Sequence, residues 1–219
     1  YNTSGLDYSY GPEKKENRLL TLYANYNKLV ESIKSSFDVT AGYDYQYWKS
    51  TTPLYSEMNT LGEIQKTSKA KDERHVLLSY YGRLNYSFDS RYMLTTTIRR
   101  DATSRFAKNV RWGTFPSVAL GWRVTEESFL KDNKVLSNLK LRASYGVTGQ
   151  QDGIGNYNYL PIYTQSQNGA EASMGNGYIH TYRPSSYVPD LKWETTTSWN
   201  VGFDFGFLKD RITGSFDYY

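Results

Sequence analysis

The sequence predicts an all-β fold, namely about eight strands from the wall of a transmembrane antiparallel up-and-down β-barrel. Three observations predict it: long runs in which apolar and polar residues alternate, an aromatic content of 16% with 22 Tyr, and links of alternating length between the runs. Successive side chains of a strand point to opposite faces, so each run has one apolar and one polar face. Because polar residues alternate with apolar ones, the chain has no apolar stretch of the roughly 20 residues that a membrane helix needs.

The first two predicted strands are residues 20–26 and residues 37–47, and the second has the cleanest alternation. Its apolar face carries Phe37, Val39, Ala41, Tyr43, Tyr45 and Tyr47, and its polar face carries Asp38, Thr40, Gly42, Asp44 and Gln46. The run exceeds the ~5–6 residues of an average strand and matches the ~9–11 residues of a membrane strand.

The same alternation predicts six further strands, at residues 76–88, 92–98, 116–124, 139–148, 198–205 and 212–218. Pro116 lacks a backbone N–H, and it lies near the start of its strand, where a missing donor is tolerated. Residues 125–130 favour a short helical turn with Thr125 as its N-cap and acidic residues in the first turn.

The links between strands alternate in length. Short links lie near residues 27–31, 89–91 and 207–211, long polar links at residues 49–72 and 149–190, and intermediate links at residues 101–111 and 125–137. Outer-membrane barrels have short periplasmic turns and long extracellular loops, so we expect the two long links on the cell exterior.

Side chains at the strand ends support a membrane environment. Aromatic residues gather there on the apolar face, as in interfacial girdles: Tyr45, Tyr47, Tyr86, Phe88, Tyr92, Trp122, Phe203 and Phe205. The opposite face carries charges of both signs, which indicate water or a polar plug beside it: Arg83, Arg99, Arg123, Lys140, Arg142, Asp38, Asp44, Asp204 and Asp217. A soluble β-sandwich with a solvated outer face predicts the same residues and stays the alternative. Arg100 occupies a position of the alternation that belongs to the apolar face. It lies at the end of its strand, where we expect it to meet anionic lipid headgroups or water.

Charge and composition exclude several functions. The net charge of +4 is scattered, which argues against a nucleic-acid partner, and the absence of Cys excludes disulfides and Cys-based metal sites. His75 and His180 are the two histidines, and neither belongs to a recognisable catalytic set, so the sequence predicts no enzyme, cofactor or metal. Asp152, Asn156 and Asn158 are spaced like oxygen ligands of Ca²⁺, but a polar turn explains them better.

Five aromatic residues outside the predicted strands are candidates for substrate contact: Trp48, Tyr157, Tyr159, Tyr163 and Tyr178. Their rings could stack on sugar rings. The alternative is that they pack the loops against themselves.

Four stretches together resemble the SusC/RagA family of TonB-linked outer-membrane transporters. They are residues 92–106 (YMLTTTIRRDATSRF), 112–123 (WGTFPSVALGWR), 139–150 (LKLRASYGVTGQ) and 191–196 (LKWETT), the last leading into the strand that contains Asn200, Val201 and Gly202. The four match the family in order and spacing, and the resemblance covers nearly the whole chain, most firmly from His75 onward.

The resemblance implies a barrel of 22 strands closed by an N-terminal plug domain, in the bacterial outer membrane. It also implies a SusD-like surface lipoprotein as partner, import of oligosaccharides or peptides, and energy from the TonB complex through a motif near the N-terminus. Residues 1–219 contain neither plug nor motif, and they stop inside a strand pattern. We therefore expect a partial barrel domain that also contacts outer-membrane lipid. A passive outer-membrane pore, or a glycan-binding surface β-protein without transport, is the alternative.

Overall fold

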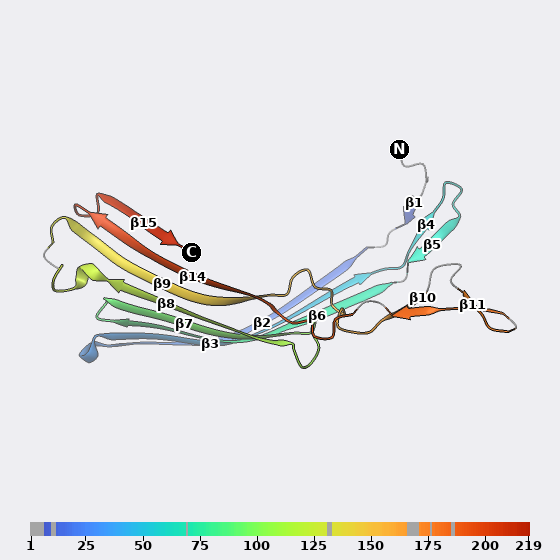
Figure 1. The fold of residues 1–219 in the computed structure, drawn as a ribbon, viewed down its shortest axis with the longest axis horizontal. Helices are drawn as coiled ribbons and strands as arrows, with labels where there is room; N and C mark the ends of the chain where they lie inside the picture. Colours follow the sequence, from blue (N-terminus) through green and yellow to red (C-terminus); the bar gives the residue numbers. More distant parts are fainter. Residues whose placement is uncertain are drawn as a thin grey trace.

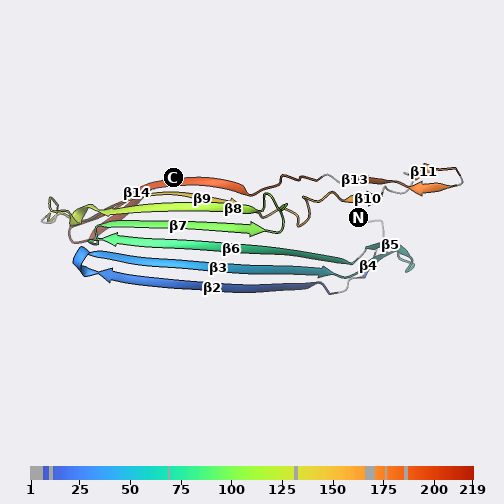
Figure 2. The ribbon, with the colours of Figure 1, turned by 90° about the horizontal axis from the view of Figure 1, so that it is seen from below.

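Eight long strands form one antiparallel sheet in the computed structural model, which describes residues 7–9, 12–68, 70–130, 133–165, 171–175, 177–184 and 187–219. Each long strand pairs with the long strands before and after it in the sequence (Figures 1 and 2), in the order β15-β14-β9-β8-β7-β6-β3-β2. Their bounds are β2 Lys14–Val30, β3 Ser35–Thr52, β6 Lys71–Phe88, β7 Tyr92–Thr103, β8 Trp112–Arg123, β9 Leu136–Gln150, β14 Glu194–Phe207 and β15 Ile212–Tyr218. The eight predicted strands and the up-and-down order are confirmed.

The strands extend further than the apolar alternation does. β3 and β6 contain 18 residues each, and their pairing continues to Thr52 opposite Lys71. At about 3.3 Å per residue, each is about 60 Å long, which exceeds the ~30 Å hydrocarbon layer. The alternation fades beyond Tyr47 because a strand outside lipid keeps its backbone ladder without needing an apolar face.

The two long links contain short strands, so their prediction as loops was wrong in part. The first link carries the hairpin of β4 (Tyr55–Met58) and β5 (Ile64–Ser68), and β1 (Asp7–Ser9) pairs with β4. The second carries two antiparallel pairs, β10 (Tyr163–Gln165) with β13 (Tyr182–Pro184) and β11 (Glu171–Ser173) with β12 (Tyr178–His180). Figure 1 shows the labelled short strands β1, β4, β5, β10 and β11 at one end of the sheet and the short turns at the other. These two ends are called the loop end and the turn end.

Two 3₁₀ turns lie at the turn end, η1 (Glu31–Ile33) and η2 (Val124–Glu126). The predicted N-cap role of Thr125 was wrong, since Thr125 lies inside η2 and Arg123, which precedes the turn, makes no capping bond from its side chain. The Thr125 hydroxyl instead accepts a hydrogen bond from the backbone N–H of Leu139, at 3.4 Å. It therefore links the turn to β9.

A small buried cluster at the loop end joins Phe106, Phe115 and Trp193. The pairing of β8 with β9 runs from Arg123 opposite Lys140 to Ser117 opposite Gly146, and it goes no further toward the loop end. The Phe115 ring lies against the backbone of Gly113 and Gly149, where a Cβ on either residue would overlap with it. The Trp193 indole donates a hydrogen bond to the Arg111 carbonyl at 2.9 Å. This aromatic cluster packs the sheet where the two strands separate.

Within the described residues, no helix has the length and apolar character needed to cross a membrane.

Candidate functional site

Arg99 lies at the centre of the first charge network on the polar face. Its Nη2 lies 3.3 Å from Asp44 Oδ2 on β3, and its Nε lies 2.9 Å from Asp101 Oδ1 on its own strand. The strand register explains the meeting, because Asp44 and Asp101 both pair with Ser79 of the intervening β6, whose side chain is fully buried. The Arg99 guanidinium also lies 5.5 Å from the centre of the Tyr81 ring.

Arg142 forms the second network across three strands. Its Nη2 lies 2.9 Å from Asp204 Oδ1 on β14, and its Nη1 lies 3.0 Å from Asp217 Oδ1 on β15. The register places Arg142 opposite Gly202, which in turn pairs with Asp217. Since Gly202 has no side chain, the long Arg142 side chain can reach the third strand.

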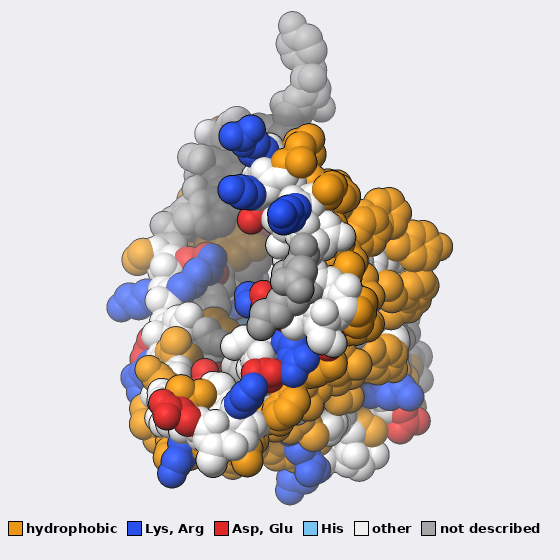
Figure 3. All heavy atoms as spheres, turned by 90° about the vertical axis from the view of Figure 1, so that its left-hand side faces the viewer, with side chains coloured by type: hydrophobic (Ala, Val, Ile, Leu, Met, Phe, Trp, Pro, Cys, Tyr) orange, Lys and Arg blue, Asp and Glu red, His pale blue; other side chains and the backbone are white. Residues whose placement is uncertain are grey.

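These networks assign the two faces of the sheet. Ionised side chains in lipid are expensive, whereas paired charges beside water or a polar domain cost little. In the end-on view of Figure 3, hydrophobic side chains gather along the right-hand outer side, and charged side chains lie around a hollow to the left. We therefore assign the polar face to the barrel lumen and the apolar face to lipid.

A cavity of about 340 Å³ lies on the polar face at the loop end. Strands β2, β3 and β6 form its floor, where the register sets Asn17 opposite Trp48 and Trp48 opposite His75. The Trp48 and His75 rings are stacked, with centroids 4.4 Å apart and an interplanar angle of 16°. Lys15, Ser50, Glu73, Arg105 and Asn156 are among the other lining residues. This combination of a flat aromatic surface with donors and acceptors suits a polar ligand that carries rings or planar groups.

Arg105 holds the second long link over this cavity. Its Nε donates to Asn156 Oδ1 at 3.2 Å, and its Nη1 donates to the Gln151 carbonyl at 3.1 Å. Its Nη2 lies 3.5 Å from His75 Nε2, and only 16% of the side chain is exposed. The link and the cavity floor are thus joined through one guanidinium.

The same contacts bear on the spacing that suggested a Ca²⁺ site. Asn156 already accepts a bond from Arg105, and Asp152 Oδ1 lies 3.9 Å from Arg105 Nη1. A guanidinium therefore supplies the positive charge beside these oxygens. Among the described residues, no group of three or more His, Asp or Glu is arranged to hold a metal ion.

The structure separates the five predicted contact residues. Trp48 lines the cavity, although it belongs to β3 and not to a loop as predicted. Tyr157 lies on the second link, where its hydroxyl accepts a 3.4 Å bond from the backbone N–H of Arg74, and Tyr159 is half-buried on the same link. Tyr163 on β10 and Tyr178 on β12 are 65% and 74% exposed. These four Tyr do not line the cavity, so their contact with substrate stays a prediction.

Sequence reasoning missed His75, Arg105 and Asn156 as a group. They lie on β6, on the link after β7 and on the link after β9, so no local spacing connects them. One signal was available in the sequence: His75 lies an even number of residues from Arg83 on the same strand, so both side chains point to the polar face.

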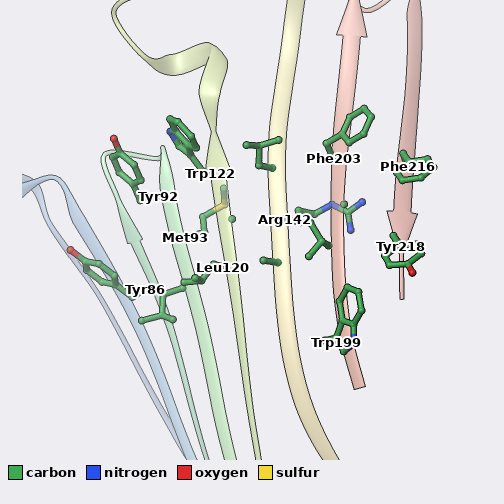
Figure 4. Close-up of a pocket in the computed structure, with 16 residues that line it drawn as sticks. Tyr86, Tyr92, Met93, Leu120, Trp122, Arg142, Trp199, Phe203, Phe216 and Tyr218 are labelled. Carbon is green, nitrogen blue, oxygen red and sulfur yellow. The ribbon is translucent and has the colours of Figure 1, made fainter. Parts of the chain in front are cut away.

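A cavity of about 860 Å³ lies on the apolar face toward the turn end and is shown in Figure 4. Its walls include Tyr92, Trp122, Trp199, Phe203 and Phe216 from four strands. Because it opens on the lipid side, we do not assign it to a polar substrate. Its aromatic rings near the turn end match an interfacial girdle.

Glu127 organises this girdle from outside the strands. It accepts hydrogen bonds from the Tyr92 hydroxyl at 2.5 Å, the Trp122 indole at 3.0 Å and Arg91 Nη1 at 3.0 Å. The bonds from Tyr92 and then Trp122 lower the pKa of the Glu127 carboxyl from its ordinary value of 4.5, against a smaller opposing effect of burial. The ionised carboxylate therefore holds β7, β8 and η2 together.

Comparison with known proteins places this geometry in a family. Residues 1–219 match the family model described as "TonB dependent receptor-like, beta-barrel". The TonB-dependent receptor SusC of Bacteroides thetaiotaomicron is 45% identical over 210 residues, which are 89% of this chain and 20% of the relative. A TonB-dependent receptor of Formosa agariphila is 35% identical over 217 residues, which are 90% of this chain and 19% of the relative. The chain thus spans about a fifth of the length of these relatives.

A solved structure shares the fold. The structure of the RagAB peptide transporter superposes with a TM-score of 0.77 at 24% identity, covering 94% of this chain and 23% of that one. In the bacterial outer membrane, a β-sheet must close into a barrel so that every backbone hydrogen bond is satisfied. The open eight-stranded sheet therefore fits part of a larger barrel. The chain belongs to the TonB-dependent receptor β-barrel family, within its SusC/RagA group.

Proposed function

We propose that residues 1–219 form part of the barrel wall of a TonB-dependent importer and that their polar face lines the path of the substrate. The single observation that carries the proposal is the cavity at the loop end of this face, with Trp48 and His75 stacked in its floor. If the loop end faces the cell exterior, this cavity lies where an incoming ligand first meets the lumen.

The cavity suits an oligosaccharide or a peptide. An aromatic ring presents a broad surface to a sugar ring or a planar peptide group, and the surrounding polar groups bond to hydroxyls or amides. Asn17 lies on β2 opposite Trp48, and Glu73 lies on β6 two residues from His75, so both add polar groups beside the stacked pair. A single stacked pair does not distinguish sugars from peptides, so both classes belong to the proposal.

The proposed partners act at opposite ends. A SusD-like lipoprotein would cover the loop end, where the described part of the second long link, with Tyr157, Tyr159, Tyr163 and Tyr178, follows β9. The TonB complex and a plug domain would act through parts of the protein outside these 219 residues. The relative named SusC and the structure titled RagAB support this arrangement by likeness. No bond of the substrate is broken in this role.

Growth and uptake in cells test the proposal. A strain that lacks the full-length protein is grown on a panel of purified oligosaccharides and on a protein digest, each as the limiting nutrient. We expect loss of growth on at least one of them, restored by the wild-type gene and abolished again when TonB is inactivated. Normal growth on the whole panel would contradict import, and growth that needs the protein but not TonB would establish the passive pore.

A further inference from the structure

The apolar face carries a group of cations at the loop end, here called the outer basic group: Arg18, Lys49, Arg74 and Arg100. Strand register places them on one face. Arg18 on β2 pairs with Tyr47 on β3. Lys49, two residues beyond Tyr47 toward the loop end of β3, pairs with Arg74 on β6. Arg100 pairs with Tyr80, whose neighbours on this face include Tyr43. All four side chains thus share the face that we assign to lipid.

The outer basic group borders the apolar band of that face. On each strand, apolar residues lie on the turn-end side of the cation: Leu20 and Leu22 beyond Arg18 on β2, Tyr45 and Tyr43 beyond Lys49 on β3, Leu78 and Tyr80 beyond Arg74 on β6, and Ile98 beyond Arg100 on β7. β3 and β6 are longer than a membrane strand requires, so the edge of the hydrocarbon layer falls within them. A cation on the lipid face costs about 2–4 kcal/mol at the bilayer midplane but only about 0–1 near an interface. The group therefore fits the level of lipid headgroups.

Arg100 has no carboxylate partner within ion-pair distance among the residues that the structure describes. Its side chain is exposed, and its guanidinium lies 5.1 Å from the centre of the Trp112 ring. Trp112 in turn stacks on Tyr80, with centroids 6.2 Å apart and an interplanar angle of 21°. The Trp112 ring thus covers one side of the guanidinium, and Tyr80 supports the Trp112 ring from behind.

The remaining cations share too few acids to be neutralised. Arg18 pairs with Glu16, while Lys49 and Arg74 share Asp72, at 3.5 and 2.6 Å. Four cations against two carboxylates leave the surface positive. Phosphate complements this surface, because a guanidinium donates two parallel bonds to its oxygens and stays charged at any relevant pH.

We propose that the outer basic group binds phosphate groups of an anionic glycolipid in the outer leaflet, with Arg100 on its Trp112 and Tyr80 support as the main anchor. The lipid chains would lie along the adjacent apolar band. This role concerns the lipid environment of the barrel and does not depend on which substrate is imported.

The test measures lipid retained by the full-length protein. The wild type and Arg100→Gln are purified in mild detergent, incubated with bisphosphorylated lipid A or with its dephosphorylated form, and examined by native mass spectrometry. We expect the wild type to retain the bisphosphorylated form preferentially. Arg100→Gln should retain it about fivefold less, which is the effect of one cation at a lipid surface.

The control is Arg83→Gln, which makes the same change on the polar face, where Arg83 contacts Thr97. It should retain lipid at the wild-type level. Arg100→Lys should lie between the wild type and Arg100→Gln, and heat-modifiable gel mobility reports whether each barrel is folded. Should a glutamine variant not fold, Arg100→Lys carries the comparison alone. Equal retention of the two lipid A forms by the wild type, or equal loss in the Arg83 and Arg100 variants, would overturn the proposal.

Discussion

The indole of Trp48 lies almost parallel to the imidazole of His75, with the ring centroids 4.4 Å apart, on two strands whose register sets these residues directly opposite each other. The Arg105 guanidinium contacts the same pair at His75 Nε2. Because the Trp48 ring is already stacked on His75, it loses little further conformational entropy when a ligand stacks on it. The pair is therefore a preorganised surface in the proposed substrate path.

Trp48→Ala is expected to weaken substrate binding to the full-length protein by about five- to thirtyfold, since a central aromatic contact is worth about 1–2 kcal/mol. Isothermal titration calorimetry with the oligosaccharide or peptide identified by growth measures the effect. Trp199→Ala is the control, because Trp199 lies on the apolar face. Unchanged affinity in Trp48→Ala would remove the cavity from the substrate path.

Phe106→Ala is expected to destabilise the barrel by about 3–5 kcal/mol, because Phe106 is fully buried beside Trp193 and truncation leaves a cavity. Urea unfolding in detergent micelles, followed by tryptophan fluorescence, measures the loss. Phe129→Ala provides the matched comparison, since Phe129 is 70% exposed, and it should change stability by less than about 0.5 kcal/mol. Similar losses of unfolding free energy in both variants would show that the buried aromatic cluster stabilises the barrel no more than an exposed Phe does.

Residues of the first long link are expected on the cell exterior. A Cys introduced at Ser56 on β4 should react with a membrane-impermeant maleimide on intact cells, whereas a Cys at Lys209, in the turn between β14 and β15, should react only after lysis. Reaction at Lys209 alone in intact cells would show that the sheet has the opposite orientation.

Glu127 should make stability at the turn end sensitive to acid. Its pKa is lowered in the folded protein, so its contribution is fully present above the ordinary value of 4.5 and is lost as the pH falls through the folded-state value. Wild-type stability, measured by thermal unfolding in detergent, should therefore fall below pH 4.5 more steeply than that of Glu127→Gln. Parallel pH profiles would mean that the three hydrogen bonds to Glu127 do not favour its ionised form.

Much of the fold could be predicted from the sequence because lipid imposes a local rule. A strand with lipid on one side must alternate, and the runs from Phe37 and from Leu139 carry that signal within a few residues. Strand ends were harder, since Thr52 and Lys71 continue the ladder in water, where no apolar pattern is required.

The candidate site was only partly predictable. Trp48 attracted notice as an aromatic residue, but its neighbours His75, Arg105 and Asn156 come together through register and through two separate links. The aromatic cluster around Phe106 was missed for the same reason, because Phe115 and Trp193 lie far from it in the sequence. Such meetings depend on tertiary packing, which no local spacing encodes.

The central claim is that this sheet separates lipid from a polar lumen. A spin-label scan of positions 39–46 on β3, in the full-length protein reconstituted into lipid bilayers, tests it most directly. Oxygen concentrates in lipid and a water-soluble nickel chelate does not, so collision with oxygen reports the lipid face. We predict a period of two, with high oxygen and low nickel accessibility at Val39, Ala41, Tyr43 and Tyr45, and low oxygen accessibility at Thr40, Gly42, Asp44 and Gln46. Uniform accessibility along the strand, or the opposite alternation, would contradict the account.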